Sequence, residues 1–228
     1  MEVCIDNLES AINAERGGAI RLELCSALSD GGLTPSVGFL RIVKQKVKIP
    51  VFVMIRPRSG DFIYSEDEIE IMSEDMKILQ ENGADGFVFG ITTSTGKIDI
   101  ERCSKLMKLA GNHPVTFHRA FDTVKDPLES LEEIISLGFQ RILTSGLQAS
   151  ASLGTSLLRQ LIDVSKGRII IMPGAGIKPD NLHFILKETN PVEFHGSAKA
   201  PKKDYFISDE NAVREMVTLF KSMYGSEK

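Results

Sequence analysis

The sequence alternates between helix-like stretches and short apolar runs, and this repeated order constrains the fold more than any other feature. In three copies a glycine separates the two parts: "AERGGAIRLELCS", "LQENGADGFVFG" and "IISLGFQRILTSG". We expect Gly18, Gly83 and Gly138 to be helix C-caps just before strands, because glycine readily adopts the left-handed backbone conformation found there. The chain is therefore predicted to be a series of helix and strand units.

Eight short apolar runs can be counted, and amphipathic segments such as residues 65–81 and "NAVREMVTLFKSM" follow them. Alternating strands and helices predict a parallel sheet with right-handed crossovers. Eight units in 228 residues favour closure into a compact α/β barrel of the (β/α)8 TIM type, one domain over residues 1–228. An open doubly wound sheet is the alternative, but the first unit lacks the G-x-G-x-x-G turn of a dinucleotide fold.

Composition limits the classes of partner. The net charge is -4 and the basic residues are dispersed, so we expect no nucleic-acid partner. No segment reaches the roughly 20 apolar residues of a membrane span, and "MEVCIDNLES" does not resemble a signal peptide. Three cysteines are too few for a secreted disulfide framework. We therefore expect reduced thiols and a cytoplasmic location.

Polar residues recur inside the predicted strands at alternate positions. In "RLELCSA", Leu22 and Leu24 can face the helices while Glu23 and Cys25 face the lumen, because an ionised glutamate against a helix layer would cost several kcal/mol. The stretch "MEVCID" repeats the pattern and sends Glu2 and Cys4 inward. Sites in such barrels lie at the C-terminal ends of the strands, so these residues are candidates for a functional site.

Further ionisable residues fall at other strand ends and predict acid/base chemistry on a small anionic molecule. His118 and His195 would exchange protons. Asp122 lies near the first in sequence and Glu193 near the second, and these acids, together with Glu23, would orient the two rings. Two arginines would hold a carboxylate or phosphate. The purely structural alternative is a closed ion-pair network of Glu2 and Glu23 with Arg56, together with hydrogen-bonded core histidines. The residues assigned to catalysis are Glu23, Arg56, His118, Asp122, Glu193 and His195.

Three glycine-containing turns are candidate anion-binding loops: "TSG", "PGAGI" and "HGSA". They follow the sixth, seventh and eighth predicted strands, where backbone N–H groups can hold a phosphate or carboxylate. Tight turns into helices are the alternative interpretation. The ligand-binding residues predicted here and after the third strand are Arg58, Ser145, Gly146, Gly174, Gly176 and Ser197.

The thiols suggest a different chemistry. Cys4 and Cys25 would lie on neighbouring strands about 5 Å apart, with their register unsettled by barrel shear. Two inward thiolates would suit Cu(I), whereas buried cysteines can also be small apolar residues. Cys103 lies in the helical "ERCSKLMKLAG" and is expected to be a packing residue.

Six stretches occur together in the order "RLELCSALSDGGLTPS", "VMIRPRSGDFIYS", "GADGFVFG", "VTFHRAFD", "RILTSG" and "EFH-x-S". In this order they resemble the copper homeostasis protein CutC family. The resemblance implies a TIM-type barrel, a cytoplasmic and in eukaryotes also nuclear location, self-association into a homo-oligomer, and copper binding or tolerance through thiols like Cys4 and Cys25. It implies no particular reaction. Ser59 and Ala175 depart from the family pattern, and a Cβ at Ala175 can block close approach of an anion.

Two hypotheses of function follow. The first is a cytoplasmic copper-binding protein of copper homeostasis that uses Cys4 and Cys25 as Cu(I) ligands. The alternative is a TIM-barrel enzyme of unstated reaction on a small phosphorylated or carboxylated molecule. A scaffold without a ligand is the weakest interpretation, because it has no need for ionisable groups at strand ends.

Overall fold

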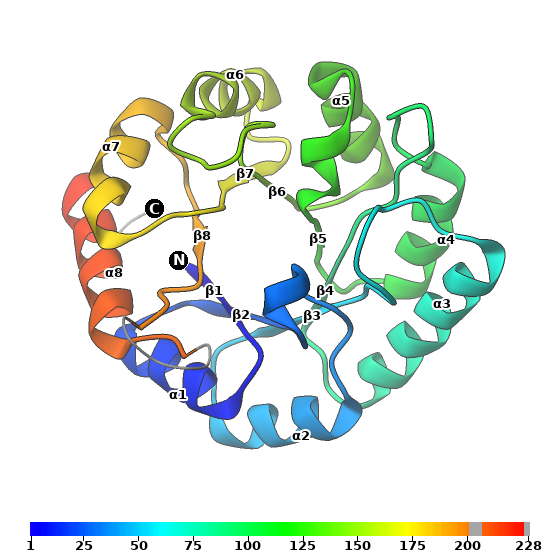
Figure 1. Ribbon diagram of the computed structural model, residues 1–228, viewed down its shortest axis with the longest axis horizontal. Coiled ribbons are helices and arrows are strands. Elements are labelled where there is room, and N and C mark those ends of the chain that lie inside the picture. The colour runs from blue at the N-terminus through cyan, green and yellow to red at the C-terminus, as the bar shows by residue number, and fades with distance from the viewer. Residues whose placement is uncertain (201–206, 226–228) are drawn as a thin grey trace.

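The computed structural model describes residues 1–200 and 207–225. Within them eight parallel strands form a ring, with the hydrogen-bonded order β7-β6-β5-β4-β3-β2-β1-β8 (Figure 1). The predicted (β/α)8 barrel is confirmed. The strands are β1 Glu2–Ile5, β2 Arg21–Leu24, β3 Val51–Met54, β4 Gly86–Phe89, β5 Val115–Phe117, β6 Arg141–Thr144, β7 Ile170–Pro173 and β8 His195–Gly196.

The α-helices lie outside the strand ring and cover its outer face (Figure 1). Most begin at a polar N-cap side chain, as at Ser65, which forms a capping box with Glu68. The α-helices are α1 Leu8–Gly17, α2 Val37–Lys46, α3 Glu66–Glu81, α4 Ile100–Ala110, α5 Pro127–Leu137, α6 Thr155–Ser165, α7 Pro179–Thr189 and α8 Glu210–Tyr224; two 3-10 helices are η1 Leu28–Asp30 and η2 Arg119–Thr123.

Glycine ends two of the predicted helices. Gly18 and Gly138 are left-handed C-caps of α1 and α5, with φ of 94° and 88°. The third expectation was off by one residue, because Asn82 caps α3 and Gly83 follows it with φ 93°. Each left-handed residue turns the chain from a helix into the next strand.

The alternation inside the strands is the one predicted. Val3, Ile5, Leu22 and Leu24 are fully buried in the main apolar core. The ladder of hydrogen-bonded strands ends at β7 and β8. Gly174 follows β7 and allows close packing there, because a Cβ at this position would lie 2.4 Å from Leu143 and 3.4 Å from the Cβ of His195. This packing brings His195 to the lumen beside β7.

None of the helices in the described residues is long and apolar enough to cross a membrane.

Candidate functional site at the barrel mouth

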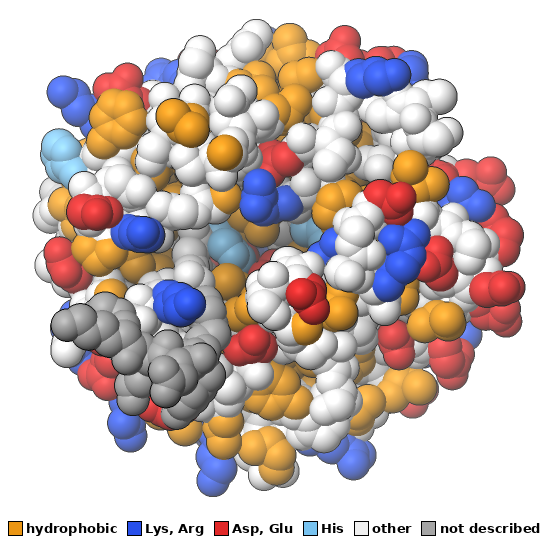
Figure 2. Space-filling model, in the orientation of Figure 1, with side chains coloured by type: hydrophobic (Ala, Val, Ile, Leu, Met, Phe, Trp, Pro, Cys, Tyr) orange, Lys and Arg blue, Asp and Glu red, His pale blue; other side chains and the backbone are white. Residues whose placement is uncertain are grey.

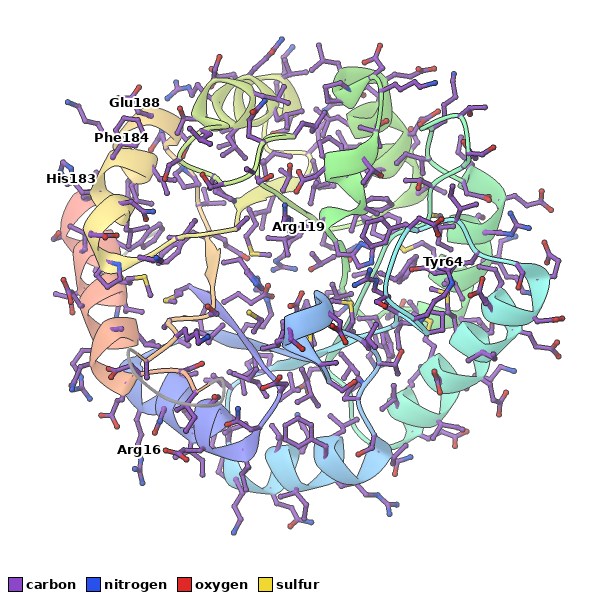
Figure 3. The ribbon with its side chains drawn as sticks, in the orientation of Figure 1. Arg16, Tyr64, Arg119, His183, Phe184 and Glu188 are labelled. Atoms are coloured by element: carbon purple, nitrogen blue, oxygen red, sulfur yellow. The ribbon has the colours of Figure 1, made fainter. Side chains whose placement is uncertain are left out.

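A cavity of about 520 Å³ opens at the C-terminal ends of the strands. Figure 2 shows histidine side chains in the central hollow of this face, with basic side chains beside it, and Figure 3 places Arg119 over the middle of the barrel. The polar side chains of the strand ends that line it include Cys4, Glu23, Arg56, His118, Arg119 and His195.

Beneath the cavity, the lower layer of the lumen is a closed charge network. Arg21 donates to Glu2 and to Glu193 at 2.5 Å each, and Arg141 donates to Glu193 at 2.9 and 3.2 Å. Burial raises the pKa of Glu2, but Arg21 and His195 outweigh it and lower this pKa to about 2. Glu2 is therefore ionised and paired, as a buried charge must be.

His195 lies directly above this layer. Its Nδ1 is 2.7 Å from Glu2 Oε1, and its Nε2 is 3.9 Å from Glu23 Oε2. Burial lowers the pKa of His195, but the neighbouring Cys4 and Glu23 outweigh it and raise this pKa well above its usual range. Glu193 was predicted to orient this ring, and that prediction is wrong. The register pairs Glu2 with His195, whereas Glu193 binds the two arginines below.

Cys4, Glu23 and His195 form a buried cluster in which one ligand atom of each lies within 4.8 Å of the others. The strand register produces it, because Cys4 is the direct lateral neighbour of Glu23. Burial raises the pKa of Glu23 to about 7. The cluster offers a sulfur, a nitrogen and an oxygen at the cavity wall, a donor set that can hold a metal ion.

Cys25 faces the lumen beside Glu23, as the alternation predicts, but it is not level with Cys4. It follows the end of β2, two residues beyond Glu23 and about 7 Å along the chain from the level of Cys4. Its thiol donates to Glu23 Oε2 at 3.6 Å and packs with Phe52, Met54 and Val88. Burial and Glu23 raise the pKa of Cys25 well above its usual range, so the thiol stays protonated. The structure thus groups Cys4 with His195 and Glu23 instead of with Cys25.

Cys103 is fully buried in the main core, where its thiol donates to the carbonyl of Ile91 at 3.8 Å. Cys103 is therefore a packing residue of α4, as expected.

His118 follows β5 on the other side of the lumen and begins η2. Its Nδ1 accepts a hydrogen bond from Ala120 N at 3.2 Å, so the ring hydrogen is on Nε2. Burial, helped by Arg56, lowers the pKa of His118 to about 3, and the ring is neutral. Gly90 leaves room for it, since a Cβ there would lie 2.7 Å from Nδ1.

Asp122 was predicted to orient a histidine, and the structure gives it another role. The η2 turn carries Asp122 to the loop after β6, where it accepts hydrogen bonds from Thr144 Oγ1 at 2.5 Å and Ser145 N at 3.0 Å. It also pairs with Arg119 at 2.7 Å. Asp122 therefore stabilises the β6 loop, and its assignment to His118 was wrong.

The two arginines after β3 diverge. Arg56 is buried and donates to the carbonyls of Asp30, Gly32 and Gly60 at 3.1, 3.3 and 2.9 Å. Arg58 turns outward and pairs with Glu68 at 2.5 Å and with Asp61. The predicted pair of ligand-binding arginines is therefore reduced to Arg56, because Arg58 stabilises the start of α3.

Only some residues of the three predicted anion-binding loops line the cavity. Gly176 and Ser197 line the cavity. Ser145 is fully buried and donates to the carbonyl of Gln148, and Gly146 packs against the backbone of Gly154, so both serve the loop itself. Gly174 packs beneath His195, and Ala175 lines the cavity with a left-handed φ of 76°.

Sequence reasoning missed several residues that build the site. Arg21 and Arg141 complete the lower layer, Phe62 packs on His118 with ring centroids 4.8 Å apart, and Gly90 leaves room for that ring. A signal for Arg21 was present, because it shares the inward parity of Glu23 and Cys25. No comparable periodic signal marks Phe62.

Comparisons with known proteins agree with this architecture. The family model described as the CutC family matches residues 1–200. The chain is 56% identical over 202 residues to the Homo sapiens "Copper homeostasis protein cutC homolog", covering 89% of this chain and 74% of that one. It is 50% identical over 212 residues to a Vibrio vulnificus family protein CutC, covering 91% and 85%.

Solved structures show the same fold. The crystal structure of the copper homeostasis protein CutC from Streptococcus agalactiae is 35% identical, with a TM-score of 0.82 over 86% of this chain and 97% of that one. The thiamine phosphate pyrophosphorylase of Pyrococcus furiosus, at 16% identity and a TM-score of 0.66 over 98% and 96%, shares the barrel fold alone.

Proposed function

Because this chain belongs to the CutC family, we propose that it binds copper as Cu(I) at Cys4, Glu23 and His195, and serves copper homeostasis in the cytoplasm. One observation carries the proposal. The three side chains are buried together at the wall of an open cavity, with a ligand atom of each within 4.8 Å of the others.

The donor set fits copper as the cargo of the site. Thiolate and imidazole are soft ligands that suit Cu(I), and a carboxylate is the hardest of the three donors. We therefore assign Cys4 Sγ and His195 Nε2 as the principal ligands and Glu23 as their neighbour. Binding at Nε2 requires that nitrogen to lose its hydrogen, so copper competes with protons for the site.

Glu2 supports the assignment from the layer beneath. Its carboxylate holds Nδ1 of His195 at 2.7 Å, which leaves Nε2 directed toward Glu23. Carboxylates commonly orient metal-binding histidines in this way and increase the basicity of the ring. In this proposal Cys25 is not a principal copper ligand, and it contributes through the hydrogen bond from its thiol to Glu23.

The proposed compartment follows from the cysteines. All three are buried free thiols, which suits a reducing compartment such as the cytoplasm, with the nucleus as a second location. A homo-oligomer remains a prediction, which light scattering of the purified protein will test.

The test is titration of the reduced protein with Cu(I) against a competing chelator. We expect Cys4→Ser and His195→Gln to lose chelator-resistant binding, a weakening of at least about 100-fold, because each removes a principal ligand. We expect Cys25→Ser to lose about 10-fold or less, and Cys103→Ser, the matched buried-thiol control, to bind as the native protein does. Equal binding by Cys4→Ser and the native protein would overturn the proposal. Loss in Cys25→Ser equal to that in Cys4→Ser would restore the paired-thiol site.

A further inference from the structure

The side of the cavity formed by β3 and β5 has no part in the copper cluster, which lies on β8, β1 and β2 (Figure 1). This side presents Arg56 and His118, which are 5% and 3% exposed. Phe62 separates them, with the guanidinium of Arg56 4.8 Å from its ring centroid and the ring of His118 also at 4.8 Å. The two side chains thus share one aromatic wall.

Arg56 is a buried cation without a counter-ion in the part of the chain that the structure describes. Its hydrogen bonds go to three neutral carbonyls, and its Nε has no partner there. Burial raises the pKa of the nearby Tyr64 to about 12, so that phenol is neutral as well. A buried charge left uncompensated is costly, and an anion in the cavity would compensate it.

His118 adds a fixed hydrogen-bond donor. Its Nδ1 is occupied by Ala120 N, and no group among residues 1–200 and 207–225 accepts the hydrogen on its buried Nε2. Buried polar groups in folded proteins nearly always have partners, so an unpaired donor lining a cavity indicates a ligand atom that accepts. A carboxylate oxygen is such an acceptor.

The remaining lining agrees in charge. It contains four basic residues, Arg56, Arg119, Lys178 and Lys199, against two acidic ones, Glu23 and Asp180. On the side of the Cys4, Glu23 and His195 cluster, Oε1 of Glu23 is also buried, and it has no partner among the described residues. The volume of about 520 Å³ is in the range of small-molecule sites.

We infer that the cavity binds a small organic carboxylate, which accepts a hydrogen bond from His118 Nε2, neutralises Arg56 and presents a polar group to Glu23. Of the four basic residues only Arg56 is buried, and the other three are exposed. One buried guanidinium and one neutral donor match a single negative charge better than a doubly charged phosphate. The inference does not rest on the proposed copper function, although Glu23 borders both sites, and this is also the anion site that the enzyme hypothesis requires.

The test uses the reduced, copper-free full chain and four probes: lactate, acetate, succinate and inorganic phosphate. Lactamide, which is the neutral amide of lactate, serves as the matched control ligand. We expect lactate to raise the melting temperature and to shift the His118 Nε2 signal in nitrogen-detected NMR. Lactamide should bind at least about 10-fold more weakly, because it carries no charge for Arg56.

Three variants isolate the donor. His118→Asn keeps an acceptor for Ala120 N but removes the Nε2 hydrogen, and we expect carboxylate binding about 10-fold weaker or more. His118→Gln returns an N–H near the position of Nε2 and should recover part of the affinity. His183→Asn changes an exposed histidine on α7 (Figure 3) and should bind as the native protein does.

The inference is wrong if no carboxylate binds with a Kd below about 10 mM, or if lactamide matches lactate. It is also wrong if His118→Asn, shown to be folded by its cooperative melting, retains native carboxylate affinity. Phosphate binding tighter than every carboxylate would overturn the ligand class. Cu(I) titration of His118→Asn separates the two proposals, since copper affinity should be unchanged in it.

Discussion

The lower and upper layers of the barrel lumen use the same kinds of residue in opposite ways. In the lower layer, Arg21 and Arg141 pair with Glu2 and Glu193, so that each buried charge has a partner. In the upper layer, Glu23, Arg56 and His118 each keep a buried polar atom without a protein partner in the described chain. Removing one member of a buried charge pair destabilises a fold, whereas an unpaired polar group beside a cavity indicates a ligand.

The strongest way to break this comparison is to remove the centre of the lower layer. Arg21→Met leaves Glu2 and Glu193 with less compensation in a buried site, and we expect the free energy of unfolding to fall by about 3–5 kcal/mol. Guanidinium denaturation measures the change. Arg168→Met is the control, because Arg168 and Glu132 form an exposed pair that should contribute less than about 1 kcal/mol. Equal, small losses in both variants would show that the lower layer is not the stabilising one.

Glu2 pairs with Arg21 in the lower layer and with His195 above it, so a substitution of Glu2 tests both layers. Glu2→Gln weakens the hold on Nδ1 of His195, and we expect Cu(I) affinity to fall about 10–100-fold, or about 1.4–2.7 kcal/mol. Glu193→Gln removes a charge from the same network but does not contact His195, so it should lower stability without changing copper affinity. Chelator competition and denaturation of both variants provide the two readouts. Equal copper affinity in the two variants would contradict the role of Glu2.

The fold could be predicted because it depends on local patterns. Glycine after helices and apolar runs of strand length gave eight units, and alternation correctly sent Leu22 and Leu24 outward. The last strand is shorter than the apolar run that predicts it, since only His195–Gly196 of that run has strand geometry. Local chemistry therefore determines which residues face the lumen.

The partners of those residues could not be predicted, because they depend on register and loop path. The lateral neighbour of Cys4 is Glu23, a consequence of the parallel register that no single strand encodes. Likewise Asp122 reaches Ser145 because a 3-10 turn redirects the chain after His118. Alternation could identify Cys4, Glu23 and His195 one by one, whereas their cluster required the assembled barrel.

The smallest expected effect concerns the stability cost of keeping His118 neutral. Its folded pKa of about 3 lies below the ordinary value of 6.5, so protons bind the unfolded chain first as the pH falls. The resulting loss of native stability is absent above pH 6.5 and grows as the pH falls from 6.5 to 3. At pH 5.5 it amounts to about 1 kcal/mol, and it should be missing from His118→Asn, which has no group to titrate there.

Urea denaturation of both proteins at pH 7.5 and 5.5 measures this difference. We expect the gap in unfolding free energy between native protein and variant to move by about 1 kcal/mol in favour of the variant at the lower pH. A gap that does not change with pH would mean that His118 titrates normally in the folded protein, and burial in the upper layer would then not keep its ring neutral.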